Sequence, residues 1–169
     1  MYGASSCVVG GNMHIKTDTD PDTGYQYEIR MNFCGCYCGY VALPSLHPLY
    51  GAKLEDERIY ELDVHGGVTY SDILNLAADD ESYALDTAWC IGFDTAHMSD
   101  YQPLATSLYY ANPMYKDMST QALARLALER QRKRLDPCTF GNIENYKSLE
   151  YVEAQCLKLA KQLKALDKF

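Results

Sequence analysis

The sequence predicts an α+β domain in which a mostly antiparallel sheet packs against a C-terminal amphipathic helix, with a second, shorter helix. Two observations favour this fold class. Four short segments in the first 94 residues have the alternation or the compact apolar runs that are typical of strands. The two clearest helical patterns come after them, and strands followed by helices are the order of an α+β fold.

The composition is that of one globular domain spanning residues 1–169. The chain has 169 residues, of which 47% are hydrophobic and 22% are charged, a balance that argues against wholesale disorder. Its net charge of −8 argues against general binding to nucleic acid. It lacks a long apolar span or a basic leader, so we expect a cytoplasmic protein with no membrane segment and with reduced thiols.

The expected strands begin with an alternation of aromatic or aliphatic and polar residues, which follows a turn cluster at Asp18–Gly24. Pro44 ends the next apolar segment, because proline has no amide hydrogen and restricts the residue before it. The four expected strands cover residues 25–30, 35–43, 58–65 and 87–94. Between the last two, residues 71–86 resemble a short helical turn followed by an acidic loop.

The expected helices lie near the end of the chain, after an extended crossing at residues 100–117. The first covers Gln121–Arg134, and Pro137 prevents its continuation. The second covers eighteen residues from Leu149 to Leu166, with apolar side chains three or four residues apart and Ser148 as its N-cap. This helix must pack on the sheet or on a second copy of the chain.

Cys34, Cys36 and Cys38 alternate in a predicted strand, which raises the question of a zinc site. Alternate strand residues are about 6.6 Å apart, whereas thiolates on one zinc ion lie within about 4 Å of each other. We therefore interpret the three cysteines as small buried side chains, with Gly35 and Gly39 allowing close backbone approach on the other face.

Three of the four histidines follow apolar segments and lie near residues with unusual backbone properties, such as proline, which restricts the backbone, or glycine, which makes it more flexible. His47 precedes Pro48, His65 precedes two glycines, and His97 lies three residues after Asp94. We expect these side chains at the rim of the sheet. His14 has no comparable setting and is interpreted as a surface or packing residue.

The same segments carry a resemblance to a known family. The quoted stretches are YCGYVALPSLHPLYG, ELDVHGGVTYS, WCIGFDTAHMSD and SLEYVEAQCLKLAKQL. Together they resemble a family of small uncharacterised proteins that is frequent in phage genomes and bacterial mobile elements. The resemblance implies a bacterial host cytoplasm and a role near host defence. Cys90, Thr95 and Ser99 depart from the pattern, where an aromatic residue, a cysteine and a glycine are expected.

The candidate site depends on these segments meeting in space. His65 and His97 could act as base and acid on a phosphoester, because imidazole exchanges protons near neutral pH. Asp94 and Asp100 could orient the imidazole rings. The residues assigned to catalysis are His65, His97, Asp94 and Asp100.

The residues assigned to ligand binding surround the same segments. The backbone amides of Gly66 and Gly67 could hold an anion, and aromatic rings could stack on a nucleotide-like ligand. The ligand-binding set is His47, Gly66, Gly67, Thr69, Tyr70 and Trp89. No metal ligand is assigned, since neither HExxH nor CxxC spacing occurs, although histidine and aspartate suit a zinc, manganese or iron ion. No cofactor is specified.

The predicted function is recognition, with hydrolysis as a finer hypothesis, of a small phosphate-bearing or nucleotide-like ligand. Two alternatives remain open. The histidines and aspartates could simply brace loops by satisfying one another. The protein could also be a non-enzymatic inhibitor that binds a host defence protein through an acidic surface, with loops 72–87 and 101–118 as contacts.

Overall fold

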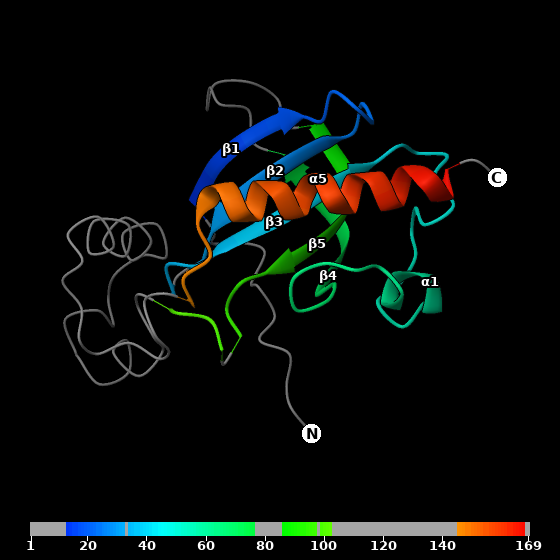
Figure 1. The fold of residues 1–169 in the computed structure, drawn as a ribbon. Coiled ribbons are helices and arrows are strands. Elements are labelled where there is room, and N and C mark those ends of the chain that lie inside the picture. The colour runs from blue at the N-terminus through cyan, green and yellow to red at the C-terminus, as the bar shows by residue number, and fades with distance from the viewer. Residues whose placement is uncertain (1–12, 33, 77–85, 98, 103–144, 168–169) are drawn as a thin grey trace.

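The computed structural model describes residues 13–32, 34–76, 86–97, 99–102 and 145–167. Within these residues, five strands form one sheet of order β1-β2-β3-β5-β4, and every neighbouring pair is antiparallel. Helix α5 lies across one face of this sheet, as Figure 1 shows, which confirms the predicted α+β class. The elements are β1 (Met13–Thr19), β2 (Gln26–Met31), β3 (Tyr37–Leu43), α1 (Glu57–Tyr60), β4 (Tyr70–Leu76), β5 (Asp86–Asp94) and α5 (Leu149–Leu166).

The turn between β1 and β2 is built around one buried aspartate. Asp20 accepts hydrogen bonds from the Asp22 amide at 3.1 Å and from the Thr23 hydroxyl at 2.6 Å. Gly24 has a φ of 75°, a left-handed conformation that glycine adopts without a steric penalty. The predicted turn therefore leads into β2, as expected from its Asp, Pro, Thr and Gly residues.

The turn between β2 and β3 carries the cysteine run. The side chain of Asn32 accepts hydrogen bonds from the amides of Cys34 and Cys36, both at 3.0 Å. The prediction that Cys34, Cys36 and Cys38 are buried is confirmed, because each is at most 5% exposed. Only Cys38 lies within the strand, since β3 begins at Tyr37.

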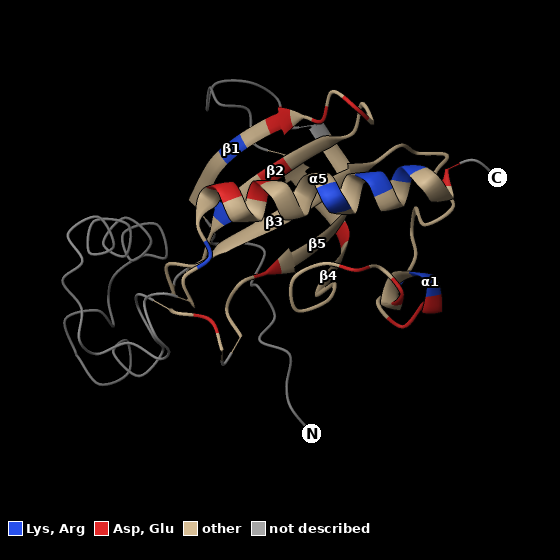
Figure 2. Cartoon of the chain, in the orientation of Figure 1, with Lys and Arg blue, Asp and Glu red and all other residues tan. Residues whose placement is uncertain are grey.

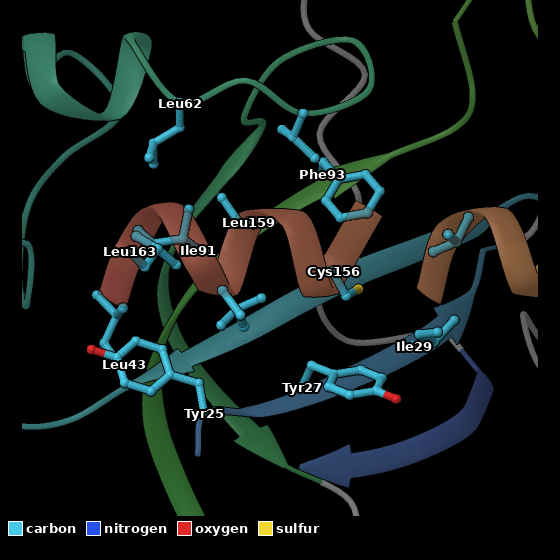
Figure 3. Close-up of a cluster of buried hydrophobic side chains, with 14 of the residues drawn as sticks. Tyr25, Tyr27, Ile29, Leu43, Leu62, Ile91, Phe93, Cys156, Leu159 and Leu163 are labelled. Atoms are coloured by element: carbon cyan, nitrogen blue, oxygen red, sulfur yellow. The ribbon is translucent and has the colours of Figure 1, made fainter. Parts of the chain in front are cut away.

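Helix α5 covers the sheet with its apolar side. Its N-cap is Ser148, whose hydroxyl accepts a hydrogen bond from the Tyr151 amide, as predicted. Figure 3 shows side chains from the helix meeting those from the strands. The helix residues buried in this core are Val152, Cys156, Leu159, Ala160 and Leu163. The apolar side is thus used within the chain, and association of two copies through it has no support.

Gly39 sets the distance between α5 and the sheet. A Cβ atom at this position would lie 2.5 Å from Cys156 Sγ and 2.6 Å from the Phe93 ring. Contacts this short are not tolerated, so only glycine permits the helix and the neighbouring strand to approach this closely. The predicted role of Gly39 in close packing is confirmed.

A second apolar cluster lies on the other face of the sheet. Successive residues of a strand point to opposite faces, so Cys38 and Tyr40 face away from α5 while Gly39 faces it. The cluster comprises Cys38, Tyr40, Tyr70, Leu74, Leu76 and Cys90. The sheet is therefore buried on both faces.

Two local predictions were wrong, and one strand was missed. The strand expected at residues 58–65 is replaced by α1 and a loop, because Asp56 caps a helical turn and the buried Ile59 and Leu62 follow helical spacing. The helical turn expected from Ser71 is strand β4, in which Leu74 and Leu76 alternate with exposed Asn75. Strand β1 had not been predicted. The extended crossing beyond residue 102 and the helix at 121–134 lie outside the described residues.

No helix among the described residues is long and apolar enough to cross a membrane.

The attachment of α5 to the sheet should depend on pH. Glu153 of α5 pairs with Lys16 of β1 and accepts a hydrogen bond from Tyr27 of β2. The Lys16 ammonium group, and then the Tyr27 hydroxyl, hold the pKa of Glu153 below its ordinary value. A lowered pKa in the folded state stabilises the protein above the unfolded pKa of about 4.3, and this stabilisation disappears as pH falls through the folded value.

We expect Glu153→Gln to lower the free energy of unfolding at pH 7 by up to about 1 kcal/mol. The difference from the wild type should shrink below about pH 4. Urea denaturation at both pH values measures it, with exposed Glu55→Gln as the control. A difference that persists at low pH would contradict the ionic origin.

Candidate functional site

His65 lies in a tight turn between α1 and β4. The Gly67 amide donates to the Val64 carbonyl at 2.9 Å, and Gly66 and Gly67 have φ values of 67° and 83°. The Thr69 amide then donates to the Gly92 carbonyl at 2.9 Å and directs the chain into β4 beside β5. The HGGVT segment thus turns sharply and presents His65 near the end of β5.

Asp94, His97 and Asp100 occupy the turn that follows β5. Asp94 is the last residue of the strand, and its carboxylate accepts hydrogen bonds from the Ala96 amide at 3.0 Å and from the Thr69 hydroxyl at 3.1 Å. The Asp100 amide donates to the His97 carbonyl at 2.9 Å, which closes a turn. These bonds explain why the three residues recur at intervals of three.

One oxygen of Asp100 joins the two histidines. Asp100 Oδ2 lies 2.9 Å from His65 Nε2 and 2.9 Å from His97 Nδ1. It also accepts a hydrogen bond from the His97 amide at 3.1 Å. The two imidazole rings have their centroids 5.4 Å apart and are inclined by 62°. We call His65, His97, Asp94 and Asp100 the His/Asp cluster.

Asp100 is buried and remains ionised. Burial alone would raise the pKa of its carboxyl group, but hydrogen bonds from His65 and His97 outweigh this effect and hold the pKa below its ordinary value. A carboxylate only accepts hydrogen bonds. Both facing imidazole nitrogens therefore carry hydrogen, which assigns the remaining nitrogens of the neutral rings as acceptors.

Gly66 makes room for the ring of His97. A Cβ atom on Gly66 would lie 2.1 Å from His97 Cε1 and 2.2 Å from Nε2. Glycine is thus required here both for its left-handed conformation and for space. The side chain of His97 is 32% exposed, and its Nε2 lies 3.8 Å from Asp94 Oδ1, beyond hydrogen-bond length. This nitrogen can therefore exchange a proton with a ligand.

The N-terminal part of α5 holds His65 from the other side. The His65 amide donates to Gln155 Oε1 at 3.0 Å, and His65 Nδ1 lies 3.0 Å from the Tyr151 hydroxyl. The ammonium group of Lys147 is 5.3 Å from the centre of the Tyr151 ring. Tyr151, Gln155 and Lys147 were not among the site residues predicted from the sequence. Their only signal was the four-residue spacing of Tyr151 and Gln155, which places both on one side of the predicted helix.

The structure brings most of the predicted site together. His65, His97, Asp94 and Asp100 are joined directly or through Thr69 and Gly66. The Gly67 amide is used within its own turn, so it does not serve the anion-binding role expected for it. One donor atom from each of His65, His97 and Asp100 lies within 4.8 Å of the other two, so this trio is the group that could hold a metal ion among the described residues.

His47 lies away from the cluster. Its Nε2 donates to the Leu163 carbonyl at 2.8 Å, because its Nδ1 accepts from the Leu49 amide at 3.0 Å. Leu163 is twelve residues after Tyr151, roughly 18 Å along the helix. His47 therefore secures the C-terminal half of α5 to the loop after β3 and contributes nothing to the cluster.

Tyr70 and Trp89 are also separate from the cluster. The Tyr70 hydroxyl donates to the Ile73 carbonyl at 2.7 Å, and its ring contacts Tyr40 on the sheet face opposite α5. Trp89 Nε1 donates to Ser71 Oγ at 3.2 Å. Trp89 lies five residues before Asp94 in β5, about 17 Å along the strand. Stacking of a ligand on these rings is not compatible with recognition at the His/Asp cluster.

We expect His47→Ala to lower the free energy of unfolding by at least about 2 kcal/mol, because it leaves a buried carbonyl and a buried amide without their partner. Urea denaturation measures this change. His14→Ala, on a partly exposed strand, should change the stability by less than about 0.5 kcal/mol. The imidazole nitrogen NMR signals of His65 and His97 should be the same in His47→Ala as in the wild type. Displaced signals would contradict the separation of His47 from the cluster.

Comparison with known proteins adds no family to this geometry. No family model matches the chain, and searches of curated proteins and of solved structures gave no significant match. The resemblance to phage proteins therefore stays a prediction.

Proposed function

We propose that the His/Asp cluster recognises a small phosphate-bearing or nucleotide-like ligand, and that hydrolysis of a phosphoester is the reaction it is best suited to perform. The observation that carries the proposal is the shared oxygen of Asp100, which orients both His65 and His97 at 2.9 Å. Two imidazoles fixed by one buried carboxylate are an arrangement suited to proton transfer.

The surroundings of the cluster supply donors for an anion. The N-terminal end of α5, which carries the positive end of the helix dipole, lies beside His65 through Tyr151. Lys147 adds a positive charge next to Tyr151. The helix end and Lys147 favour a ligand with negatively charged oxygen atoms.

The reaction would divide between the two histidines. His97 Nε2 takes a proton from water while the water oxygen bonds to phosphorus, and the bond from phosphorus to the leaving oxygen breaks. The leaving oxygen then takes a proton from a water molecule, or from His65 when both nitrogens of that ring carry hydrogen. Asp100 holds both rings in place, and Asp94 Oδ1 lies 3.8 Å from His97 Nε2.

We expect AMP and inorganic phosphate to shift the imidazole NMR signals of His65 and His97, because they occupy the cluster. His97→Ala and Asp100→Asn should each weaken AMP binding at least about tenfold, a loss of about 1.4 kcal/mol. Bis(p-nitrophenyl) phosphate serves as the reporter for hydrolysis, through the absorbance of nitrophenol.

His14→Ala is the matched control, since it removes an imidazole outside the cluster. Urea denaturation must show that each variant is folded. Wild-type affinity for AMP and phosphate in folded His97→Ala and Asp100→Asn would exclude the proposal. Binding without hydrolysis of the reporter would restrict the function to recognition.

The inhibitor hypothesis has one supporting observation within the described residues. Residues 55–63 contain five acidic side chains and one arginine, and Tyr60 in α1 is 89% exposed. Figure 2 shows this acidic segment around α1. Residues 72–76 of the predicted contact loops form β4, and most of the rest lies outside the described residues. An exposed aromatic residue among acidic ones suits a basic partner protein.

Under the inhibitor hypothesis, reversing the charge of residues 55–63 should abolish the inhibition, whereas changing the His/Asp cluster should not affect it. Replacing Glu55, Glu57 and Glu61 by lysine should abolish protection of a phage from bacterial defence, measured by plaque counts, because like charges would then face the basic partner. His97→Ala should protect as well as the wild type. The opposite pattern would favour ligand recognition by the cluster.

A further inference from the structure

Three donor atoms of the His/Asp cluster converge as metal ligands do. His65 Nε2 and His97 Nδ1 each lie 2.9 Å from Asp100 Oδ2, and one atom from each residue lies within 4.8 Å of the others. Ligands of a tetrahedral zinc ion, bound at about 2.0–2.1 Å, are about 3.3 Å apart. The two nitrogen–oxygen distances thus need to lengthen by only a few tenths of an ångström.

The types of ligand restrict the choice of ion. Two imidazole nitrogens and one carboxylate suit a divalent transition ion such as Zn²⁺, Mn²⁺ or Fe²⁺, whereas Ca²⁺ and Mg²⁺ prefer oxygen ligands. Three protein ligands also leave a coordination position for water or for a ligand, as catalytic zinc sites do.

Other residues hydrogen-bond to the candidate metal ligands and fix their orientation. A metal-bound histidine usually hydrogen-bonds through its other ring nitrogen, which fixes the ring orientation. His65 Nδ1 lies 3.0 Å from the Tyr151 hydroxyl, and the His65 backbone is fixed by Gln155. Asp100 is fixed by the His97 amide at 3.1 Å. The tyrosine hydroxyl can donate to Nδ1 without metal and accept from it when metal occupies Nε2.

The formal charge of the cluster also favours a bound cation. With neutral imidazoles, Asp94 and Asp100 give the cluster a charge of −2, which opposes the phosphate-bearing ligand proposed above. One divalent cation would cancel this charge and contribute a direct bond to a phosphate oxygen. Lys147, located at the ring of Tyr151, supplies a single positive charge at the edge of the cluster.

We propose that His65, His97 and Asp100 bind one divalent transition metal ion, with Zn²⁺ as the test case, and that this ion is the group that receives the phosphate. The second part rests on the proposed function, whereas metal binding does not. With its Nδ1 on the ion, His97 would carry its hydrogen at Nε2 and would donate it to the ligand instead of accepting a proton there. The ion would lower the pKa of a bound water molecule, whose proton would pass to the solvent.

The test measures metal binding by the whole chain without any phosphate ligand. Competition with a chromophoric chelator gives the affinity for Zn²⁺, and the visible spectrum of Co²⁺ reports the ligand type and geometry. We expect one ion per chain, no sulfur-to-cobalt charge-transfer band, and weaker binding at lower pH, because the imidazoles must lose protons to bind. Asp100→Asn, which keeps the shape of the side chain, and His97→Ala should each weaken binding at least about tenfold.

His14→Ala controls for loss of a histidine outside the cluster and should bind as the wild type does. Absence of saturable binding, a cysteine-type cobalt spectrum, or unchanged affinity in both cluster variants would overturn the proposal. AMP titrations with and without EDTA separate the two proposals. If AMP binds equally with EDTA and no metal binds, the metal site is excluded and recognition stands. If metal binds and AMP does not, the proposed function fails and the metal site stands.

Discussion

The close approach of α5 to the sheet at Gly39 is the constraint on which the described structure depends. A side chain at this position would collide with Cys156 and Phe93, so the helix would have to move outward. Because α5 is a straight element of eighteen residues, its position at the centre determines the position of both ends. One end carries Tyr151 to His65, and the other brings the Leu163 carbonyl to His47. Packing in the core thereby sets the geometry of the cluster.

The fold was predictable where the local pattern and the tertiary environment agree. Ser148 and the apolar spacing of α5 defined the helix to its final bounds, and Pro44 ended β3. Prediction failed where the buried positions of a segment did not match the pattern of apolar residues in its sequence. In β4, Ile73 is 54% exposed although it is apolar, which hides the alternation. In the segment before His65, Ile59 is buried in α1, whereas Leu62 and Val64 are buried in the loop after it, and their two-residue spacing resembles that of a strand.

The site was predictable only in part, because sequence shows which side chains can react and not which of them meet. His65, His97 and Asp100 meet because two turns lie at neighbouring ends of β4 and β5, which pair in the sheet. His47 has a similar local setting, with a proline and an apolar segment, and its hydrogen bonds nevertheless bind it to the backbone of α5. A histidine that braces a helix and one that joins the His/Asp cluster have the same sequence signature.

The hydrogen bonds around His65 allow the proton positions in the cluster to change while the His65 ring keeps its orientation. The Tyr151 hydroxyl can donate to or accept from His65 Nδ1, so the 3.0 Å contact is compatible with either proton position on the ring. The His65 amide bond to Gln155 does not involve the ring and is retained in both cases. A proton can therefore leave the nitrogen that faces Asp100 while the ring keeps its orientation. A metal ion at this position would make a further demand, since it would displace hydrogen from both imidazole nitrogens that face the buried carboxylate, whereas a proton accepted at His97 Nε2 would leave them in place.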